Sequence, residues 1–430
     1  MLNFLSNSVA LSGDRKKIII NLMLVSLFVT LVCVASLFFQ NKNYQHSLPY
    51  YLSSSLSNNI FNIRFNEIEV NDFNSISFSK SGQYNKEKGG YKFSEISQTI
   101  HDRDSIKEHF GYMISYGFLA YIKMAKAILP DFGDLNAIIV MNIIIHILST
   151  LFFASLFKFR FSQVFFCLIY GLNPLVLYLA TFSYYYYPVV GFSVGIMALH
   201  KINFSNENLN SYKEVLWIMA TIFFVAMRPT LLVGLIFGFL YFFYKFERRY
   251  IYIASIALAV ALFGYIKSQS SSEYSPWFTV YVGFGAYNNI QGFTLRDKSA
   301  YDFLRSDSKE SNPAEQKKDV DIFRSKVVEI VFDNKMLYLY NASRNILQVF
   351  GYGYHTRSQM LNYISAALGI ITILLFYKLK LYFLLFMIFF SNIGYLLYFP
   401  PIAVYMASTY ILLAFGWIFS MERMYENRIK

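Results

Sequence analysis

Charged residues are scarce in this chain: Asp, Glu, Lys and Arg together make up 15% of its 430 residues. A typical globular protein has about 25% charged residues. Cysteine is rarer still, because Cys33 and Cys167 are the only two, and both lie in apolar runs where we expect small buried hydrophobic side chains. Two cysteines exclude a disulfide framework and a cysteine-based metal site. The sequence also contains no Walker loop, dinucleotide fingerprint, HExxH motif or paired CxxC motif.

Apolar and aromatic residues are abundant instead. Hydrophobic residues make up 56% of the chain and aromatic residues 20%, with a mean hydropathy of +0.38. This composition excludes intrinsic disorder. It favours a polytopic membrane protein.

Ten apolar segments carry this hydrophobicity. A helix that crosses a bilayer needs about 20 apolar residues, and most of the ten approach that length. The first is too long for the core of a signal peptide and lacks a cleavage pattern, so we interpret it as a permanent anchor. The predicted fold class is an all-α polytopic membrane protein with about 10 transmembrane helices. The segments are 18–39, 135–157, 163–182, 186–200, 215–227, 231–244, 251–268, 358–377, 381–398 and 402–420.

The net charge of +12 is distributed unevenly along the chain. With alternate gaps assigned to alternate sides, one side receives both termini and the short gaps, which hold 15 Lys/Arg and 6 Asp/Glu. The other side receives two long loops, 40–134 and 269–357, which hold 21 Lys/Arg and 20 Asp/Glu. Short basic loops stay in the cytoplasm, so we expect both termini there. The positive charge is therefore a topology signal, and we expect no nucleic-acid partner.

This topology divides the chain into five parts. They are the cytoplasmic N-terminus and first span (1–39), the first extracytoplasmic loop (40–134), the membrane body (135–268), the second extracytoplasmic loop (269–357), and the C-terminal spans with a cytoplasmic tail (358–430). The pattern of 105–129 predicts a helix that lies in the membrane interface. The pattern of 314–345 predicts one or two amphipathic helices.

The densest titratable cluster outside the cytoplasm is His101 to His109. Asp104 and Glu108 are four residues apart and share a helix face, and Asp102 comes just before that helix. We predict that one of these three carboxylates is the general base for an acceptor hydroxyl, with His109 contacting substrate. The alternative is a solvated helix start. A metal bound by His101, Asp102 and His109 matches no strong signature, so we assign no metal and leave the cofactor unknown.

The second loop contains the most specific stretch, 283–297. Its glycines, asparagines and aromatic residues predict a tightly turned, ordered segment with a surface suited to a sugar. The alternative is a structural loop packed on the membrane body. The predicted substrate-binding residues here are Tyr287, Asn288, Asn289 and Asp297.

Polar residues in and beside the membrane body complete the candidates. Arg228 lies between two short apolar segments, and Arg344 lies in the second loop; a guanidinium suits bidentate contact with a phosphate. The alternative for Arg228 is a side chain that extends to the interface. For His146, in the middle of an apolar segment, we expect a buried, hydrogen-bonded histidine rather than a proton relay. For 184–187, four consecutive tyrosines, we expect an interfacial aromatic belt.

Several of these motifs are found together in a known superfamily. They are Gly171-Leu-Asn173-Pro174, Met227-Arg228-Pro229, the 283–293 loop with Asp297, and 341–350, together with 109–119 followed by Leu129-Pro-Asp-Phe-Gly-Asp134. In motifs and organisation the chain resembles a poorly characterised bacterial branch of the C-type superfamily of membrane glycosyltransferases. That superfamily usually places an acidic pair soon after the first span, whereas the first acid after Phe39 is Glu67. Glu67, Glu69 and Asp72 therefore remain alternative bases.

The resemblance implies a glycosyltransferase that moves a sugar from a polyprenyl-phosphate carrier to an extracytoplasmic acceptor, with inversion. Arg228 and Arg344 would steady the phosphate leaving group. The expected location is the bacterial inner membrane. Two alternatives remain: a polymerase or ligase of lipid-linked polysaccharide repeats, and a transporter or flippase of lipid-linked sugars. Transport usually needs ionisable groups or broken helices near the bilayer centre, and the ten segments contain few ionisable residues.

Overall fold

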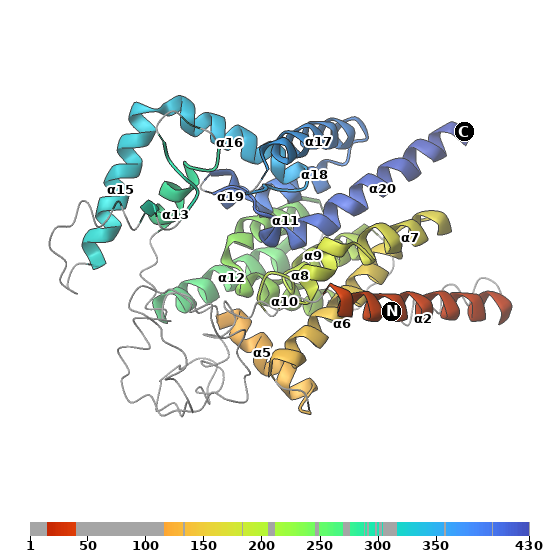
Figure 1. Cartoon of the computed structure of the whole chain (residues 1–430). Helices are drawn as coiled ribbons and strands as arrows, with labels where there is room; N and C mark the ends of the chain where they lie inside the picture. The colour runs from red at the N-terminus through yellow and green to blue at the C-terminus, as the bar shows by residue number, and fades with distance from the viewer. Residues whose placement is uncertain are drawn as a thin grey trace.

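The regular elements in the described part of the chain are all helices (Figure 1). The computed structural model describes residues 15–39, 116–131, 134–182, 184–204, 211–245, 249–269, 276–287, 289, 292–296, 299–300, 303, 316–356, 358–397 and 399–429. Within these ranges the β-type pairing is a single parallel bridge between Tyr354 and Ile402. The all-α prediction is confirmed.

Each of the ten apolar segments is helical. In chain order they form α2 (Arg15–Phe38), α6 (Asp134–Ala154), α7 (Arg160–Phe166) with a π-helical turn (Cys167–Gly171) and α8 (Pro174–Ala180), α9 (Val190–Phe204), α10 (Ser211–Met227), α11 (Leu232–Lys245), α12 (Arg249–Gln269), α17 (Gln359–Lys378), α18 (Tyr382–Ser391) with α19 (Ile393–Leu397), and α20 (Ala407–Ile429). The remaining helices are α5 (Tyr116–Ile128), α13 (Pro276–Gly283), α15 (Gln316–Asp333) and α16 (Lys335–Phe350), with 3-10 turns at Pro229–Leu231 and Ala403–Tyr405.

Three of these helices are long and apolar enough to cross a membrane: α2, α6 and α17. A fourth crossing results if α7 and α8, which meet at an angle of 62°, count as one bent span. The other predicted spans are shorter or broken, except in α12, where the apolar part is limited to Tyr250–Gly264, and in α20, which carries charges near its C-terminal end.

Two of the breaks have a local cause in the sequence. Pro174 cannot continue the preceding helix, and Asn173 caps the next one by accepting hydrogen bonds from Leu175 N at 3.0 Å and Val176 N at 3.3 Å. Arg228 is extended (φ −145°, ψ 90°) because a residue before proline avoids the helical region, and α10 ends there. Arg228 is thereby placed at the corner between α10 and α11.

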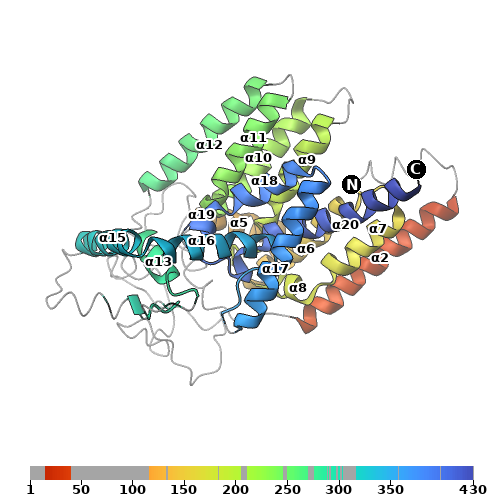
Figure 2. The ribbon, with the colours of Figure 1, turned by 90° about the horizontal axis from the view of Figure 1, so that it is seen from above.

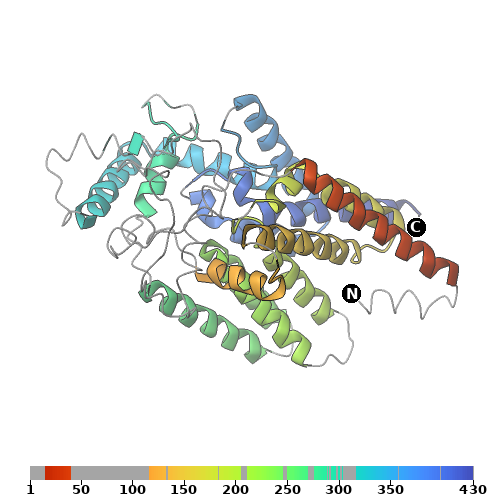
Figure 3. The same ribbon diagram turned by 60° about the horizontal axis from the view of Figure 1, so that its bottom comes forward.

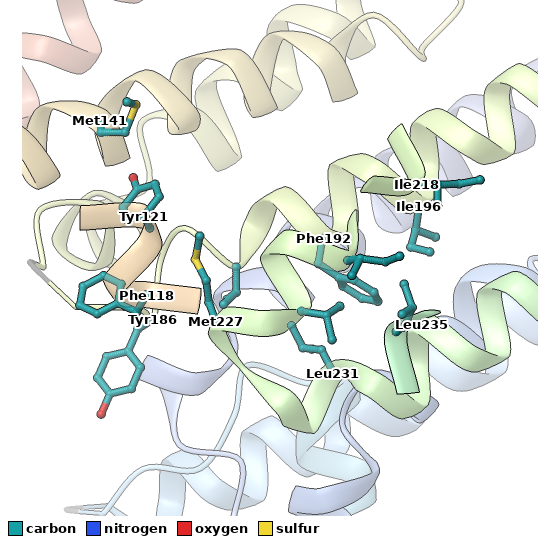
Figure 4. Packing of buried hydrophobic residues seen from close by; sticks show 14 of the residues in the cluster. Phe118, Tyr121, Met141, Tyr186, Phe192, Ile196, Ile218, Met227, Leu231 and Leu235 are labelled. Atoms are coloured by element: carbon teal, nitrogen blue, oxygen red, sulfur yellow. The ribbon is translucent and has the colours of Figure 1, made fainter. Parts of the chain in front are cut away.

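Aromatic and aliphatic side chains together fill the main core (Figure 4). Phe118 and Tyr121 of α5 pack between α6 and the α10–α11 corner, whereas Phe192 and Leu235 lie deeper among α9 and α11. The face of α5 that carries Tyr121 is buried, and Ile128 is exposed. Of the interface helix predicted over 105–129, the described residues form a helix over Tyr116–Ile128, and this helix packs on the body.

Three of the four consecutive tyrosines are buried. Tyr184, Tyr186 and Tyr187 are 7%, 8% and 0% exposed, and Tyr185 is half-buried. Tyr186 packs edge-on against the ring of Tyr405. The expectation of an interfacial belt is wrong, because the turn between α8 and α9 folds these rings inward. Cys33 also departs from expectation: it is exposed on α2, while Cys167 is half-buried.

His146 is buried and hydrogen-bonded, as predicted. Its Nε2 lies 2.8 Å from the carbonyl oxygen of Gly171, and its Nδ1 lies 2.5 Å from the hydroxyl of Tyr187. A carbonyl only accepts, so Nε2 carries the proton and Nδ1 accepts from the tyrosine. The histidine therefore ties α6 to the π-helical turn.

The helices α9, α10, α11 and α12 lie side by side, and α2 runs along the outside of the bundle beside α6 and α8 (Figures 2 and 3). One end of the body, which we call the basic end, is defined by an ion pair and hydrogen bonds between residues that are far apart in the sequence. Lys158 forms an ion pair with Glu426 at 2.8 Å, Arg160 donates to Asn21 Oδ1 at 2.9 Å, and Arg423 donates to the carbonyl of Leu379 at 2.7 Å. The described residues of the gaps 158–162 and 378–380 and of the C-terminal part of α20 therefore share one end of the molecule.

The opposite end, the cavity end, holds α13, α15 and the first turns of α16 (Figure 1). Thr181 donates to the carbonyl of Phe39 at 3.1 Å, which joins the C-terminal ends of the apolar segments 18–39 and 163–182. The prediction of one or two helices over 314–345 is confirmed by α15 and α16. Phe323, Val327 and Ile330 of α15 pack on α13, and the second half of α16 packs across α17.

Candidate functional site

A cavity of about 910 Å³ lies at the cavity end. Its walls come from the loop after α13 (285–287, 289 and 292–296), from Arg344 of α16, and from the segment 354–362 that enters α17. Ligand sites typically occupy about 300–1,000 Å³. Arg344 and Arg296 line it, and its described lining contains no carboxylate. The cavity therefore suits an anion.

The loop wall is a closed turn built around Asn289. The amide nitrogen of Asn289 donates to the carbonyls of Tyr287 at 2.9 Å and Phe293 at 3.1 Å, and its oxygen accepts from Phe293 N at 2.9 Å. Gly292 has φ +75°, which favours glycine. The ordered turn predicted for this stretch is present in its described residues. The Asn289 amide is engaged by the loop backbone, so it shapes the wall.

Arg344 is held by three tyrosine rings. Its guanidinium carbon lies 4.6 Å from the ring centre of Tyr287, 4.7 Å from that of Tyr363 and 5.2 Å from that of Tyr340. Its Nη1 also donates to the Tyr340 hydroxyl at 2.6 Å. No carboxylate in the described chain lies within salt-bridge distance of it. The half-buried cation keeps unused donors for an anionic ligand.

Below Arg344, Tyr287 belongs to a chain of hydrogen bonds. Its hydroxyl donates to Asn345 Oδ1 at 2.7 Å, and Asn345 Nδ2 donates to the carbonyl of Tyr395 at 3.0 Å. Burial raises the pKa of Tyr287, and the Arg344 charge opposes that shift. Tyr287 is therefore a neutral phenol with a fixed ring face.

The far wall consists of Tyr354, His355 and Asn362. Tyr354 N donates to the carbonyl of Pro401 at 2.7 Å, and its hydroxyl donates to the carbonyl of Ala286. The Asn362 amide bonds both backbone groups of His355, accepting from N at 2.7 Å and donating to O at 3.0 Å. Burial lowers the pKa of His355, so its imidazole is neutral at pH 7.

Arg228 is a second, enclosed cation outside the cavity lining. It is 4% exposed, donates to the carbonyl of Tyr405, and lies 4.7 Å and 5.3 Å from the ring centres of Tyr395 and Tyr405. Its Nη2 is buried without a partner, and burial lowers the pKa of Arg228 to about 10. The alternative of a side chain extending to the surface is wrong for this residue. Tyr395 links it to Asn345 and so to the floor of the cavity.

The structure thus brings Tyr287, Asn289 and Arg344 to one cavity and leaves Arg228 one layer behind it. The other predicted residues lie outside the described chain: Asp102, Asp104, Glu108, His109, Asn288 and Asp297, and the alternative acids Glu67, Glu69 and Asp72. The described residues hold no group of three His, Cys, Asp or Glu side chains placed for a metal.

Sequence reasoning missed Tyr354, His355 and Asn362. A signal was present in Gly351-Tyr-Gly-Tyr-His355, where glycine and aromatic residues alternate between an amphipathic helix and an apolar segment. Gly353 has φ +87°, which lets the chain turn back toward Pro401.

The fold defines an all-α protein with helices of membrane-spanning length and composition. No family model, curated protein or solved structure matches the chain.

Proposed function

We propose that this protein is a polytopic membrane glycosyltransferase with about ten crossings, both termini in the cytoplasm, and the cavity at the outer face of a bacterial inner membrane. The basic end supports that orientation, since short basic gaps stay in the cytoplasm. Exposed apolar side chains along α2 and α17 support embedding in lipid.

The observation that carries the proposed activity is the cationic cavity beside the apolar helices. A polyprenyl-phosphate-linked sugar has a negative phosphate between a lipid chain and a polar ring. Arg344 and Arg296 fit the phosphate, and the face of Tyr287 fits the sugar. Arg228 supports this floor from behind through Tyr395 and Asn345.

The proposed reaction is an inverting transfer. The acceptor oxygen forms a bond to the anomeric carbon, the bond from that carbon to the phosphate oxygen breaks, and polyprenyl phosphate leaves with the electron pair. The acceptor proton passes to a carboxylate, for which Asp102, Asp104 and Glu108 are our first candidates and Glu67, Glu69 and Asp72 the second. Alanine at each of the six in turn tests this base: transfer that survives every substitution contradicts it.

The deciding experiment uses the purified full chain and a labelled polyprenyl-phosphate sugar. We expect release of polyprenyl phosphate with an acceptor fraction from the same envelope, and a loss of at least about tenfold in Arg344→Gln, since charge-assisted contacts contribute roughly 1.5–3 kcal/mol. Arg423→Gln, an arginine stacked on Phe419 at the basic end, is the matched control and should keep activity. Release only from a carrier that bears an oligosaccharide indicates a polymerase or ligase, and movement of the lipid without release indicates a flippase.

A further inference from the structure

An exposed apolar row lies where α15 meets α16. Phe332, Met336, Leu339 and Tyr340 are 68%, 78%, 57% and 46% exposed. Their spacing of three and four residues places the α16 members on one helix face. Contiguous apolar surface of this kind marks an interaction site.

The same surface continues onto α17. Met360, Tyr363 and Ile364 are exposed in its first turns, and Leu374 is exposed further along the helix. α16 crosses α17 so closely that a Cβ at Gly369 would overlap the carbonyl oxygen of Leu347. The two exposed faces therefore belong to helices that are in direct contact.

Arg344 lies at the boundary between that surface and the cavity. On one side it contacts Tyr340 and Tyr363, which belong to the exposed faces of α16 and α17. On the other side it stacks on Tyr287 and lines the cavity, next to Gln359 and Asn362 of α17. The Arg344 guanidinium therefore contacts both the exposed apolar surface and the cavity.

The length of α17 gives the depth of Arg344 in a membrane. Its 20 residues rise about 30 Å, which matches the hydrocarbon core. Lys378 ends α17 at the basic end, so Gln359 lies at the level of the opposite headgroups, and Arg344 with it. Phosphates of bilayer lipids lie at that level.

We infer that the cavity opens sideways into the bilayer between α16 and α17, and that the phosphate of a membrane lipid reaches Arg344 through this opening while its chain stays in the leaflet along α17. The apolar faces fit the chain, and the cation without a described carboxylate partner fits the phosphate. The inference rests on the proposed function only in identifying that lipid as the carrier.

The test measures binding and needs no sugar transfer. The full chain is placed in nanodiscs of neutral lipid that contain a long-chain polyprenyl monophosphate, and native mass spectrometry counts the bound lipid. We expect a loss of at least about tenfold in Arg344→Gln, the size of one charge-assisted contact. We expect a comparable loss in Ile364→Trp, which adds bulk beside Tyr363 at the opening.

Two matched variants control for general damage. Arg423→Gln removes a stacked arginine at the basic end, and Leu374→Trp adds the same bulk ten residues along the exposed face of α17. Both should bind lipid as the native protein does, and excess inorganic phosphate should not displace the lipid.

Three results would overturn side entry: no bound lipid in the native protein, equal binding by Arg344→Gln, or equal effects of Ile364→Trp and Leu374→Trp. Displacement by inorganic phosphate would also overturn it, because it indicates a site filled from water. Any of these would leave the transfer assay of the proposed function to be decided separately.

Discussion

At the scale of single residues, Arg228 carries its charge where water does not reach. The guanidinium has a carbonyl and two tyrosine rings as partners, and the described chain offers it no carboxylate. Burying a charge without a counter-ion costs free energy of folding, and a hydrophobic residue of similar volume removes that cost. The charge of Arg228 is therefore expected to lower the stability of the fold.

We predict that Arg228→Met unfolds at the same or a higher temperature than the native protein, with a gain of up to about 1–4 kcal/mol, while sugar transfer falls. Thermal unfolding followed by size-exclusion chromatography measures the first effect, and carrier release measures the second. Arg228→Lys keeps the charge without the planar group and is the control, expected to gain nothing. A clear loss of stability in Arg228→Met would show that the charge is compensated.

We expect His355 to make the cavity sensitive to pH. Its pKa is lowered below the ordinary 6.5 by burial, so the folded state binds a proton less readily than the unfolded state. The stability contributed by the neutral ring is complete above about pH 6.5 and is lost as the pH falls toward the lower folded pKa. Protonation of the folded protein, as the pH reaches that lower pKa, adds positive charge to a cavity lined by Arg344 and Arg296.

We therefore predict that lipid-phosphate binding in the native protein, relative to His355→Gln, strengthens by up to about fivefold as the pH falls below 6.5, the size of a screened charge pair. Taking the ratio of the two binding affinities at each pH removes the effect of the lipid phosphate's own titration, because both proteins bind the same ligand. Binding titrations in nanodiscs from pH 7.5 to about 5 provide the data. Parallel profiles would show that His355 does not face the anion.

At the scale of helices, the tight crossing of α16 and α17 depends on one missing side chain. Gly369→Ala would place a Cβ on the carbonyl oxygen of Leu347, whereas a Cβ at Gly264 of α12 would meet open space. We expect Gly369→Ala to destabilise by about 1–3 kcal/mol and Gly264→Ala to stabilise by up to about 1 kcal/mol through helix propensity. The thermal unfolding temperatures of the two variants and the native protein are measured in the same detergent. If both substitutions change the stability in the same direction, the close crossing of α16 and α17 is contradicted.

The bend between the π-helical turn and α8 depends on the Asn173 cap. Asn173→Ala removes the acceptor for two backbone N–H groups and should cost about 0.5–2 kcal/mol, whereas Asn173→Asp keeps an acceptor and should cost little. Thermal unfolding of the three proteins gives the comparison. Equal losses would mean that the cap contributes nothing beyond Pro174.

The helices themselves were predictable because long apolar runs in lipid must satisfy their backbone within the helix. Their ends were less so: 163–182 reads as one span, but Asn173 and Pro174 break it. The cavity was predictable only in part. Tyr287 and Arg344 could be chosen from residue type, whereas the roles of His355 and Asn362 arise from contacts across the α17 entrance, which no local pattern encodes.

At the scale of the whole molecule, the distribution of charge and the polar contacts at the basic end predict which end of the protein faces the cytoplasm. Ser325 on α15 is exposed near the cavity end, and Asn427 on α20 is exposed near the basic end. In a background with Cys33 and Cys167 replaced by alanine, we expect Ser325→Cys to react with a membrane-impermeant maleimide in intact cells. Asn427→Cys should react only after the cells are permeabilised.

The two introduced cysteines test two separate statements: that the two ends of the protein lie on opposite sides of the membrane, and which end faces the cytoplasm. The contacts between Lys158 and Glu426 and between Arg423 and Leu379 place the described basic gaps at one end of the molecule. Labelling of Ser325→Cys and Asn427→Cys from the same side of the membrane would contradict the placement of the cavity end and the basic end on opposite sides. The excess of short basic gaps decides which side that is. A reversed pattern would keep the helical body but place the cavity in the cytoplasm, where carriers facing the outer leaflet do not reach Arg344, and transfer at the outer face would then be excluded.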